Sequence, residues 1–384
     1  MQKKRVMISA GDISGDIYAA ELVDGLRKKY ENIEFLAVAG ERTASRGVEL
    51  LAHSNDLNIM GFTQVVANIG LIFSTWRKLT NALQQWKPDV LVLIDYPGLN
   101  MRLAKVAARC GIEVLYYVPP QVWAWGRSRV RHLRRDVAQL LVLYPHEYHY
   151  LHSQRLPVKM VSHPLLQQTQ WLELPTLASN DPLVIVLMPG SRRQELERHV
   201  DVMLSACYQL QVSSGQPVCA VLLKAPGIAG VMCEQACTAW KSVLQVHTVA
   251  VAQRQQWLTR AHCACVVSGT ASFELALMGL PMLVVYTTNW VNYTLARLLL
   301  ATRLRWISLP NLSAQADIVP ELVRVSLDAR LLAEHLHRLV YDADYRSKMR
   351  CGLAALRQKV QVQQTDMSVA EHVGKLMHSV GPNV

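Results

Sequence analysis

The fold of this chain is decided by the stretch C-V-V-S-G-T-A-S-F-E-L-A-L-M-G-L-P-M-L-V-V-Y, residues 265–286. The stretch opens with the end of an apolar run and breaks at Ser268-Gly269-Thr270. It continues with helical spacing from Ala271 to Met278 and resumes as a strand-like run from Pro281. This order predicts a strand, a tight turn, a helix and a second strand, which together make a βαβ crossover.

The turn at residues 268–270 has the features of a phosphate site. Ser268 or Thr270 can cap the new helix, whose free N–H groups and positive dipole end then face the space above the turn. A diphosphate fits that position, and Glu274 lies about one turn further on, within reach of a ribose hydroxyl. An ordinary crossover with a Ser/Thr cap explains these residues equally well.

Length and composition indicate a globular protein of two domains. The chain has 384 residues, of which 51% are hydrophobic and 18% are charged, enough for each domain to bury a core. No segment approaches the roughly 18–20 apolar residues that span a bilayer. The apolar run after the basic start is too short for a signal peptide, which predicts a cytosolic protein. The eight cysteines contain no C-x-x-C pair, and we expect reduced packing residues and no metal site.

The net charge of +11 and the pI near 9.3 predict a polyanionic partner or an anionic surface. The arginines cluster in two places, namely Arg127, Arg129, Arg131, Arg134 and Arg135, and then Arg297, Arg303 and Arg305. A solvated helix face is the simplest explanation of these clusters. Binding of nucleic acid is the more specific alternative explanation of the clusters, but no helix-turn-helix, zinc-finger or RNA-binding signature accompanies the charge.

The first half of the chain has the pattern of a doubly wound α/β domain. Residues 5–10 predict a strand, residues 11–16 a glycine-bearing loop, and residues 17–29 a helix. Ligands of such sheets bind over the carboxyl ends of the strands. The loop has G-x-x-x-G and lacks G-x-G-x-x-G, so no nicotinamide cofactor is expected.

Asp95 follows a continuous apolar run, which is typical of a parallel strand buried on both faces. The motif Y-P-G-L-N and a predicted helix over residues 101–110 come next. A carboxylate at this position can accept a proton from a substrate hydroxyl. It can also cap the following helix, and the residues alone favour the cap.

Residues 59–86 are apolar around much of their circumference. Such a segment lies in a membrane interface if it is exposed, and it forms one or two core helices if it is buried. The pattern alone favours the core.

The second half repeats the alternation of strand and helix after a polar stretch that ends at Pro182. Residues 183–188 predict a strand, and Pro189-Gly190-Ser191-Arg192 predicts a glycine turn that opens a helix. The arginines lie where a phosphate could be clamped. The whole pattern predicts an α/β protein with two doubly wound, Rossmann-like domains that face each other across a cleft.

An ordered set of short motifs resembles that of bacterial lipid-A-disaccharide synthase, from about residue 5 to about residue 340. The motifs are Gly11-Asp12-Ile13-Ser14-Gly15-Asp16, Met60-Gly61, Ile94-Asp95-Tyr96-Pro97, Val122-Trp123-Ala124-Trp125, His163-Pro164, Pro189-Gly190-Ser191-Arg192, Ser268-Gly269-Thr270-Ala271, Glu274 and Ser308-Leu309-Pro310-Asn311. Each motif alone is weak, but W-A-W, P-G-S-R, S-G-T-A and S-L-P-N in this order are jointly specific.

The resemblance implies an inverting glycosyltransferase of the GT-B kind, which needs no cofactor and no metal. Such an enzyme joins UDP-2,3-diacylglucosamine to 2,3-diacylglucosamine 1-phosphate, and it releases UDP and the β-1,6-linked disaccharide of lipid A. The resemblance further implies an acceptor-binding domain over residues 1–165, a linker over 166–182 and a UDP-sugar-binding domain over 183–345. A helical tail over residues 346–384 would cross back or be exchanged in a homodimer.

The resemblance also assigns roles to residues. Asp95, Arg192 and Asn311 would be catalytic, with Asp95 as the base. The donor would be bound by Gly190, Ser191, Arg192, Ser268, Gly269, Thr270, Glu274 and Asn311. The acceptor would be bound by Ser14, Gly15, Asp16, Met60, Gly61, Trp123 and Trp125.

Acylated, phosphorylated substrates imply a peripheral enzyme on the inner face of the inner membrane of a Gram-negative bacterium, with the basic clusters facing anionic headgroups. The chain departs from the family pattern at Gly98, Ser162, Gln315, Ala316 and Arg324, which could change the acceptor or acyl-chain preference. A UDP-sugar 2-epimerase would share the two-domain plan. A nucleic-acid binder would use the charge alone and would leave the motifs without a purpose.

Overall fold

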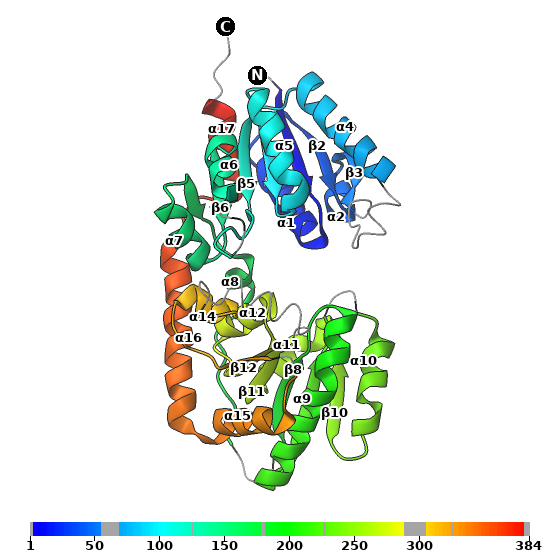
Figure 1. Cartoon of the computed structure of the whole chain (residues 1–384), viewed down its shortest axis with the longest axis vertical. Coiled ribbons are helices and arrows are strands. Elements are labelled where there is room, and N and C mark those ends of the chain that lie inside the picture. Colours follow the sequence, from blue (N-terminus) through cyan, green and yellow to red (C-terminus); the bar gives the residue numbers. More distant parts are fainter. Residues whose placement is uncertain are drawn as a thin grey trace. The chain divides into compact units, whose positions relative to one another are not determined.

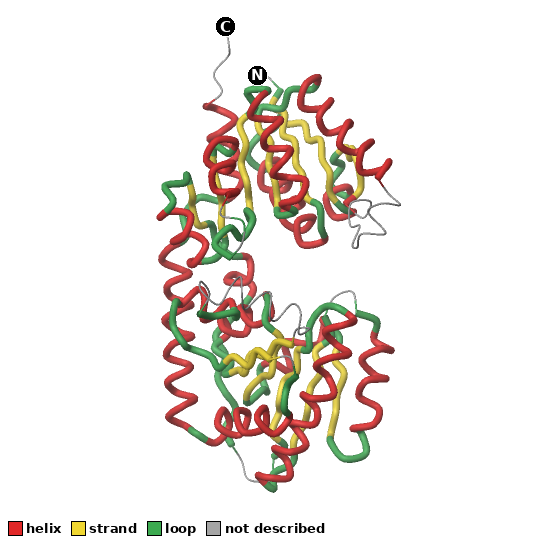
Figure 2. The backbone as a smooth tube through the Cα atoms, viewed as in Figure 1, coloured by secondary structure: helices red, strands yellow, loops and turns green. Residues whose placement is uncertain are grey.

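The computed structural model describes residues 3–54, 69–124, 126, 128–177, 181–225, 228–287, 305–324 and 326–379. The chain divides into two compact units. Unit 1 comprises Met1–Ser162 and Gln363–Val384, and unit 2 comprises His163–Val362. Each unit is a parallel sheet with helices on both faces (Figures 1 and 2). The predicted α/β class with two doubly wound sheets is confirmed.

Unit 1 contains a seven-stranded parallel sheet in the order β3-β2-β1-β4-β5-β6-β7. The strands are β1 (Lys4–Ala10), β2 (Ile33–Ala39), β3 (Glu49–His53), β4 (Val90–Ile94), β5 (Glu113–Tyr117), β6 (Gln139–Val142) and β7 (Val158–Met160). The strand order reverses between β1 and β4, so their carboxyl ends form the switch point at which doubly wound folds bind ligands.

Helices cover both faces of this sheet. They are α1 (Ile13–Arg27), α2 (Glu41–Ala44), α4 (Ile69–Gln85), α5 (Pro97–Arg109), α6 (Ser128–Asp136), α7 (Pro145–Ser153) and α17 (Val369–Ser379). On one face α5 lies between α4 and α6, and on the other α17 packs beside α1 (Figure 1). Helix α1 begins four residues earlier than predicted because the Asp12 carboxylate accepts the Gly15 N–H at 2.7 Å and caps it.

Unit 2 contains a six-stranded parallel sheet in the order β10-β9-β8-β11-β12-β13. The strands are β8 (Leu183–Met188), β9 (Val218–Leu223), β10 (Gln245–Val249), β11 (Cys263–Val267), β12 (Met282–Thr287) and β13 (Glu321–Arg324). The switch point lies between β8 and β11. The stretch 265–286 is therefore the predicted strand, turn, helix and strand.

The helices of unit 2 also lie on both faces of their sheet (Figure 1). They are α8 (Pro164–Gln168), α9 (Arg193–Ser214), α10 (Gly230–Cys237), α11 (Arg254–Leu258), α12 (Thr270–Met278), α14 (Leu309–Ala314), α15 (Ala329–Tyr341) and α16 (Ala343–Gln363), with 3₁₀ turns η2 (Thr238–Trp240) and η3 (Val251–Gln253). Helix α9 packs beside both α10 and α15.

The edge strands β3 and β13 were not predicted. Their residues are mostly half-buried, so they lack the continuous apolar run that reveals a central strand. Of the apolar segment 59–86, α4 buries Thr75, Leu79 and Leu83 and leaves Phe73 62% exposed, while residues 55–68 lie outside the described residues. Within the described ranges, no helix is both long enough and apolar enough to cross a membrane.

The C-terminal helix α17 completes the core of unit 1. Ala370, Val373 and Met377 belong to the same buried cluster as Ile8 of β1 and Val92 of β4. Residues more than 250 positions apart in the sequence therefore bury one continuous apolar surface, and unit 1 cannot be complete without the end of the chain.

We predict that Met377→Ala lowers the free energy of unfolding of unit 1 by about 2–5 kcal/mol, because it removes a fully buried side chain. Urea denaturation followed by tryptophan fluorescence measures the change. Lys375→Ala on the exposed side of the same helix is the matched control and should change little. Equal effects of the two substitutions would contradict the packing of α17 described above.

Candidate functional site

Asp95 lies at the carboxyl end of β4 on an unusual backbone. Asp95 and Tyr96 have φ values of +47° and +45°, in the left-handed region that residues other than glycine seldom adopt. The Asp95 carbonyl oxygen accepts hydrogen bonds from Asn100 Nδ2 at 2.8 Å and from the Tyr116 hydroxyl at 2.9 Å. Such a conformation persists only where its surroundings hold it, and it is common at functional sites.

Asn100 is the residue that joins the two strands of this switch point. Its side chain is fully buried. Its Oδ1 accepts the Ser9 hydroxyl at 2.7 Å, and its Nδ2 also donates to the carbonyl oxygens of Ser9 and Ile94 at 3.2 Å. Asn100 was not predicted as a site residue, because only the pairing of β1 with β4 brings Ser9 to it.

The interpretation of Asp95 as a helix cap is wrong. The cap position of α5 is held by Tyr96, whose side chain makes no capping hydrogen bond to the helix, and the Asp95 carboxylate instead accepts the Tyr96 N–H at 2.8 Å. Burial, and then the nearby charge of Asp12, raise the pKa of Asp95 to about 6, against that hydrogen bond. A carboxylate with this pKa is ionised at neutral pH and is well suited to accept a proton.

The loop over residues 11–16 begins with a glycine that the packing of the Tyr96 ring requires. A Cβ on Gly11 would lie 2.2 Å from the Tyr96 ring, so the ring can cover the loop only because residue 11 has no side chain. Ser14 is exposed, whereas Gly15 is buried.

The carboxylate of Asp16 is buried and accepts hydrogen bonds from groups of the same chain. It accepts the N–H groups of Gly40, Arg42 and Thr43 at 2.8–3.1 Å and the Thr43 hydroxyl at 2.6 Å. Burial alone would raise the pKa of Asp16, but these hydrogen bonds hold it below the ordinary value. Asp16 thus anchors α2 to α1.

The aromatic loop after β5 packs onto the start of α7. The half-buried Trp123 meets His146 edge-to-face at 4.8 Å between ring centroids, and Tyr144 stacks on His146 at 5.6 Å. The neighbouring Glu147 is 4% exposed. His146 and Glu147 were not predicted. Trp125, Met60 and Gly61 lie outside the described residues.

Glu147 is a buried acid near Asp95. Burial raises its pKa to about 8, the Asp95 charge adds to the shift, and the Tyr144 N–H and Trp123 indole oppose it. Glu147 is therefore mostly protonated at pH 7 in the folded protein. An unfolded glutamate loses its proton near pH 4.5, so the unfolded state binds fewer protons between pH 4.5 and 8 and the stability falls across this window.

We predict that Glu147→Gln makes the protein more stable than wild type, by a few kcal/mol near pH 7, with a smaller gain at pH 5. The amide removes the cost of protonation and keeps an oxygen to accept the Tyr144 N–H. Urea denaturation at the two pH values measures the difference. A gain that is the same at both would show that Glu147 does not titrate as described.

In unit 2 the P-G-S-R loop is held by Glu195, which was not predicted. Its Oε2 accepts the N–H groups of Ser191 and Arg192 at 2.8 and 3.2 Å. Gly190 has φ +120°, and a Cβ there would lie 2.3 Å from Glu195 Oε2, so this contact needs glycine. The Arg192 side chain stays 73% exposed, 3.7 Å from Glu195, and can reorient toward a ligand.

The S-G-T turn leaves the first turn of α12 without a side-chain cap. The cap position is Gly269, with φ +154°, so the predicted Ser/Thr cap is wrong. The Ser268 hydroxyl donates instead to the Ile307 carbonyl at 3.1 Å. In the first helical turn the Ser272 N–H donates to the Gly269 carbonyl oxygen at 3.1 Å. The N–H groups of Thr270 and Ala271 come before the first residue that can form a bond within the helix, which favours an anion at this end of α12.

Glu274 and Asn311 are both engaged with the protein. The Glu274 carboxylate lies 2.8 Å from Arg254 in a largely buried ion pair. The Asn311 amide donates to the Val319 carbonyl and to Glu321, and its Oδ1 accepts the N–H groups of Ile318 and Val319, all at 2.7–2.9 Å. The Asn311 side chain therefore fastens the S-L-P-N turn to β13.

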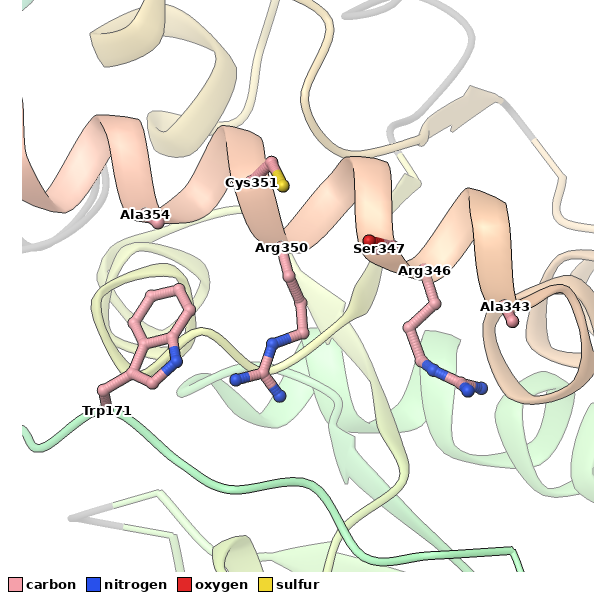
Figure 3. Close-up of a pocket in the computed structure, with 7 residues that line it drawn as sticks. All are labelled: Trp171, Ala343, Arg346, Ser347, Arg350, Cys351 and Ala354. Carbon is pink, nitrogen blue, oxygen red and sulfur yellow. The ribbon is translucent and has the colours of Figure 1, made fainter.

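A pocket beside α16 contains none of the predicted site residues (Figure 3). The Arg350 guanidinium lies 5.1 Å from the centre of the Trp171 ring and donates to the Leu172 carbonyl at 2.9 Å. These contacts fasten the segment before β8 to α16, which is a structural role.

The two doubly wound sheets define the class of protein, which is the GT-B glycosyltransferase fold. The calicheamicin glycosyltransferase CalG4 superposes with a TM-score of 0.61 at 14% identity, with 100% of both chains covered. MurG of Acinetobacter baumannii superposes with a TM-score of 0.60 at 15% identity, with 98% of this chain and 100% of that chain covered.

Sequence comparison then gives the family. The model of the lipid-A-disaccharide synthetase family matches residues 6–373. The lipid-A-disaccharide synthase of Geobacter metallireducens is 32% identical over an alignment of 375 residues, and the match covers 93% of each chain. The chain belongs to the lipid-A-disaccharide synthase family of glycosyltransferases, and the predicted resemblance is confirmed.

Proposed function

We propose that this chain joins UDP-2,3-diacylglucosamine to 2,3-diacylglucosamine 1-phosphate and releases UDP and the β-1,6-linked disaccharide 1-phosphate. The observation that carries the proposal is Asp95, an acid with a pKa raised to about 6 on a left-handed backbone at a switch point. The family membership supports the substrates.

The proposed step is a single displacement. The Asp95 carboxylate takes the proton of the acceptor 6-hydroxyl, and the hydroxyl oxygen bonds to the anomeric carbon of the donor. The bond from that carbon to the UDP oxygen breaks, its electron pair leaves with UDP, and the anomeric configuration inverts. Residues that stabilise the charge developing on the diphosphate lower the barrier.

The donor would lie at the carboxyl end of β11. The uncapped first turn of α12, with Ser268, Gly269 and Thr270, supports diphosphate binding there. The exposed Arg192 would neutralise the leaving group from the loop of Gly190 and Ser191. Glu274 would bind the ribose in the orientation that Arg254 imposes, and Asn311 would act by shaping the turn that receives the Ser268 hydroxyl.

The acceptor would lie at the carboxyl ends of β1, β4 and β5. Ser14 is exposed there, Asp16 and Gly15 would shape the loop, and Trp123 would offer an apolar wall. The proposed acceptor contacts of Met60, Gly61 and Trp125 concern residues outside the described ranges.

Incubation of the purified protein with both substrates in mixed micelles and a chelator tests the reaction. Mass spectrometry should detect UDP and disaccharide in equal amounts. UDP without disaccharide would indicate hydrolysis of the donor, and neither product would reject the proposed substrates.

We predict that Asp95→Asn lowers turnover by about a hundredfold or more and leaves the UDP affinity nearly unchanged, because the amide cannot accept the proton. Asp89→Asn is the matched control, since Asp89 lies at the amino end of the same strand and accepts the Arg5 N–H at 2.7 Å. Wild-type turnover in Asp95→Asn would remove Asp95 from the role of base.

We also propose that unit 1 binds an anionic membrane surface through α4, α5 and α6. These helices pack side by side, and their only acid, Asp136, is buried and paired with Arg135 at 2.6 Å. Their exposed cations are Arg77, Lys78, Arg102, Lys105, Arg109, Arg129, Arg131, Arg134 and Arg135. The exposed Phe73 would add apolar contact, and each cation near the surface contributes about 1 kcal/mol.

We predict that the double substitution Arg102→Glu and Lys105→Glu weakens cosedimentation with phosphatidylcholine vesicles containing phosphatidylglycerol by about tenfold or more. The pair Lys28→Glu and Lys348→Glu makes the same change in net charge elsewhere on the surface and should bind nearly as wild type. If the two double variants bind equally, total charge and not this surface attracts the membrane.

A further inference from the structure

His199 is a buried histidine of α9 whose two ring nitrogens both meet backbone groups. It is 1% exposed. Its Nδ1 lies 2.7 Å from the Glu195 carbonyl oxygen, and its Nε2 lies 3.2 Å from the Thr287 backbone nitrogen and 2.9 Å from the Thr287 hydroxyl. Because a backbone N–H can only donate, Nε2 must be the acceptor. The imidazole is therefore neutral, with its proton on Nδ1 donated to Glu195.

These contacts connect the loop after β8 with the carboxyl end of β12, on either side of the S-G-T turn. The sheet order places β11 between β8 and β12. The His199 ring contacts the backbone carbonyl of Glu195, and the Glu195 side chain in turn accepts the N–H groups of Ser191 and Arg192 in the loop after β8. The ring also contacts Thr287, the last residue of β12. One imidazole thus joins the loop after β8 to the carboxyl end of β12, on either side of the proposed diphosphate site.

We propose that His199 is a positioning residue of the donor site, which holds the loop after β8 and the carboxyl end of β12 in the geometry that binds UDP while its imidazole is neutral. Protonation would turn Nε2 into a donor facing the Thr287 N–H, so the contact with that backbone group would be lost and only the Thr287 hydroxyl could still accept from the ring. The inference rests on the proposed donor site and adds a residue that the family motifs do not contain.

The surroundings of His199 favour the neutral ring. Burial, first, and the Arg198 charge lower its pKa, while the carbonyl oxygens of Glu195 and Pro189 and the Glu195 charge oppose the shift. Thr287, the contact from β12, carries no charge. The stabilising effect of the neutral ring is therefore complete above the ordinary histidine value of 6.5 and is lost as the pH falls through the lowered pKa.

Two substitutions separate positioning from mere packing. In His199→Gln the amide oxygen can still accept the Thr287 N–H, and the side chain does not titrate. In His199→Ala the connection is lost. We predict that His199→Ala weakens UDP binding about tenfold or more, because small displacements of binding loops are costly, while His199→Gln binds within about threefold of wild type at pH 7.5.

The pH dependence gives the decisive comparison. Isothermal titration calorimetry with UDP over a pH series, from pH 7.5 down to the lowest pH at which both proteins stay folded, should show that wild-type affinity falls more than that of His199→Gln. The phosphate of UDP also titrates near pH 6, but it does so equally for every variant, so the difference between variants is informative. Identical losses in the two proteins would overturn the proposal.

His262 is the matched control. It is a half-buried histidine of the same unit, burial lowers its pKa, and its Nδ1 accepts the Val184 N–H at 3.1 Å. It precedes β11 and therefore lies at the amino end of the sheet, away from the motifs. His262→Gln should leave UDP affinity and its pH dependence unchanged. Equal effects at both histidines would show a loss of stability and not of positioning.

The outcomes also separate this inference from the proposed function. If wild type binds no UDP, the donor site itself is wrong. If wild type binds UDP and His199→Ala binds it equally well, the donor site stands and the positioning role fails. If His199→Ala does not fold, the pH comparison of wild type with His199→Gln still decides the question.

Discussion

A strand that is buried on both faces can carry no uncompensated polar side chain until it ends. The central strands β4 and β11 obey this constraint, with the fully buried runs V-L-V-L-I and C-A-C-V-V. The first polar residues after them are Asp95 and Ser268, at the switch points of the two sheets. The proposed base and the proposed diphosphate turn therefore both lie where the apolar runs stop.

Some motif residues have exposed side chains, and others have side chains that hydrogen-bond to the loops around the proposed site. Ser14, Thr270 and Arg192 have exposed side chains. Asp16 and Asn311 have theirs occupied by hydrogen bonds within the chain. Both kinds would serve the proposed binding site, because a ligand loop made of short polar segments is ordered only if other groups satisfy its backbone.

The buried Glu147 and the half-buried Asp95 lie close together in unit 1. Asp95 and Glu147 both have raised pKa values because burial disfavours their charged forms. Their proximity means that ionisation of one opposes ionisation of the other. The protonated Glu147 therefore helps to keep the negative charge on Asp95, where the proposed proton transfer needs it. The exposed cations of α4, α5 and α6 form a separate system on the surface, suited to a partner that is too large to enter a site.

The sequence by itself determined the central strands, the S-G-T and P-G-S-R turns and the family. Apolar runs, helical spacing and glycine turns are local properties that a chain expresses without knowledge of its neighbours. Only the tertiary structure decided that Glu147 is a buried acid, that Asn100 joins β1 to β4 and that α17 completes unit 1. The same holds for His199, whose contact with Thr287 joins residues 88 positions apart. Burial and pairing of this kind depend on which distant segments meet, and no local pattern contains that information.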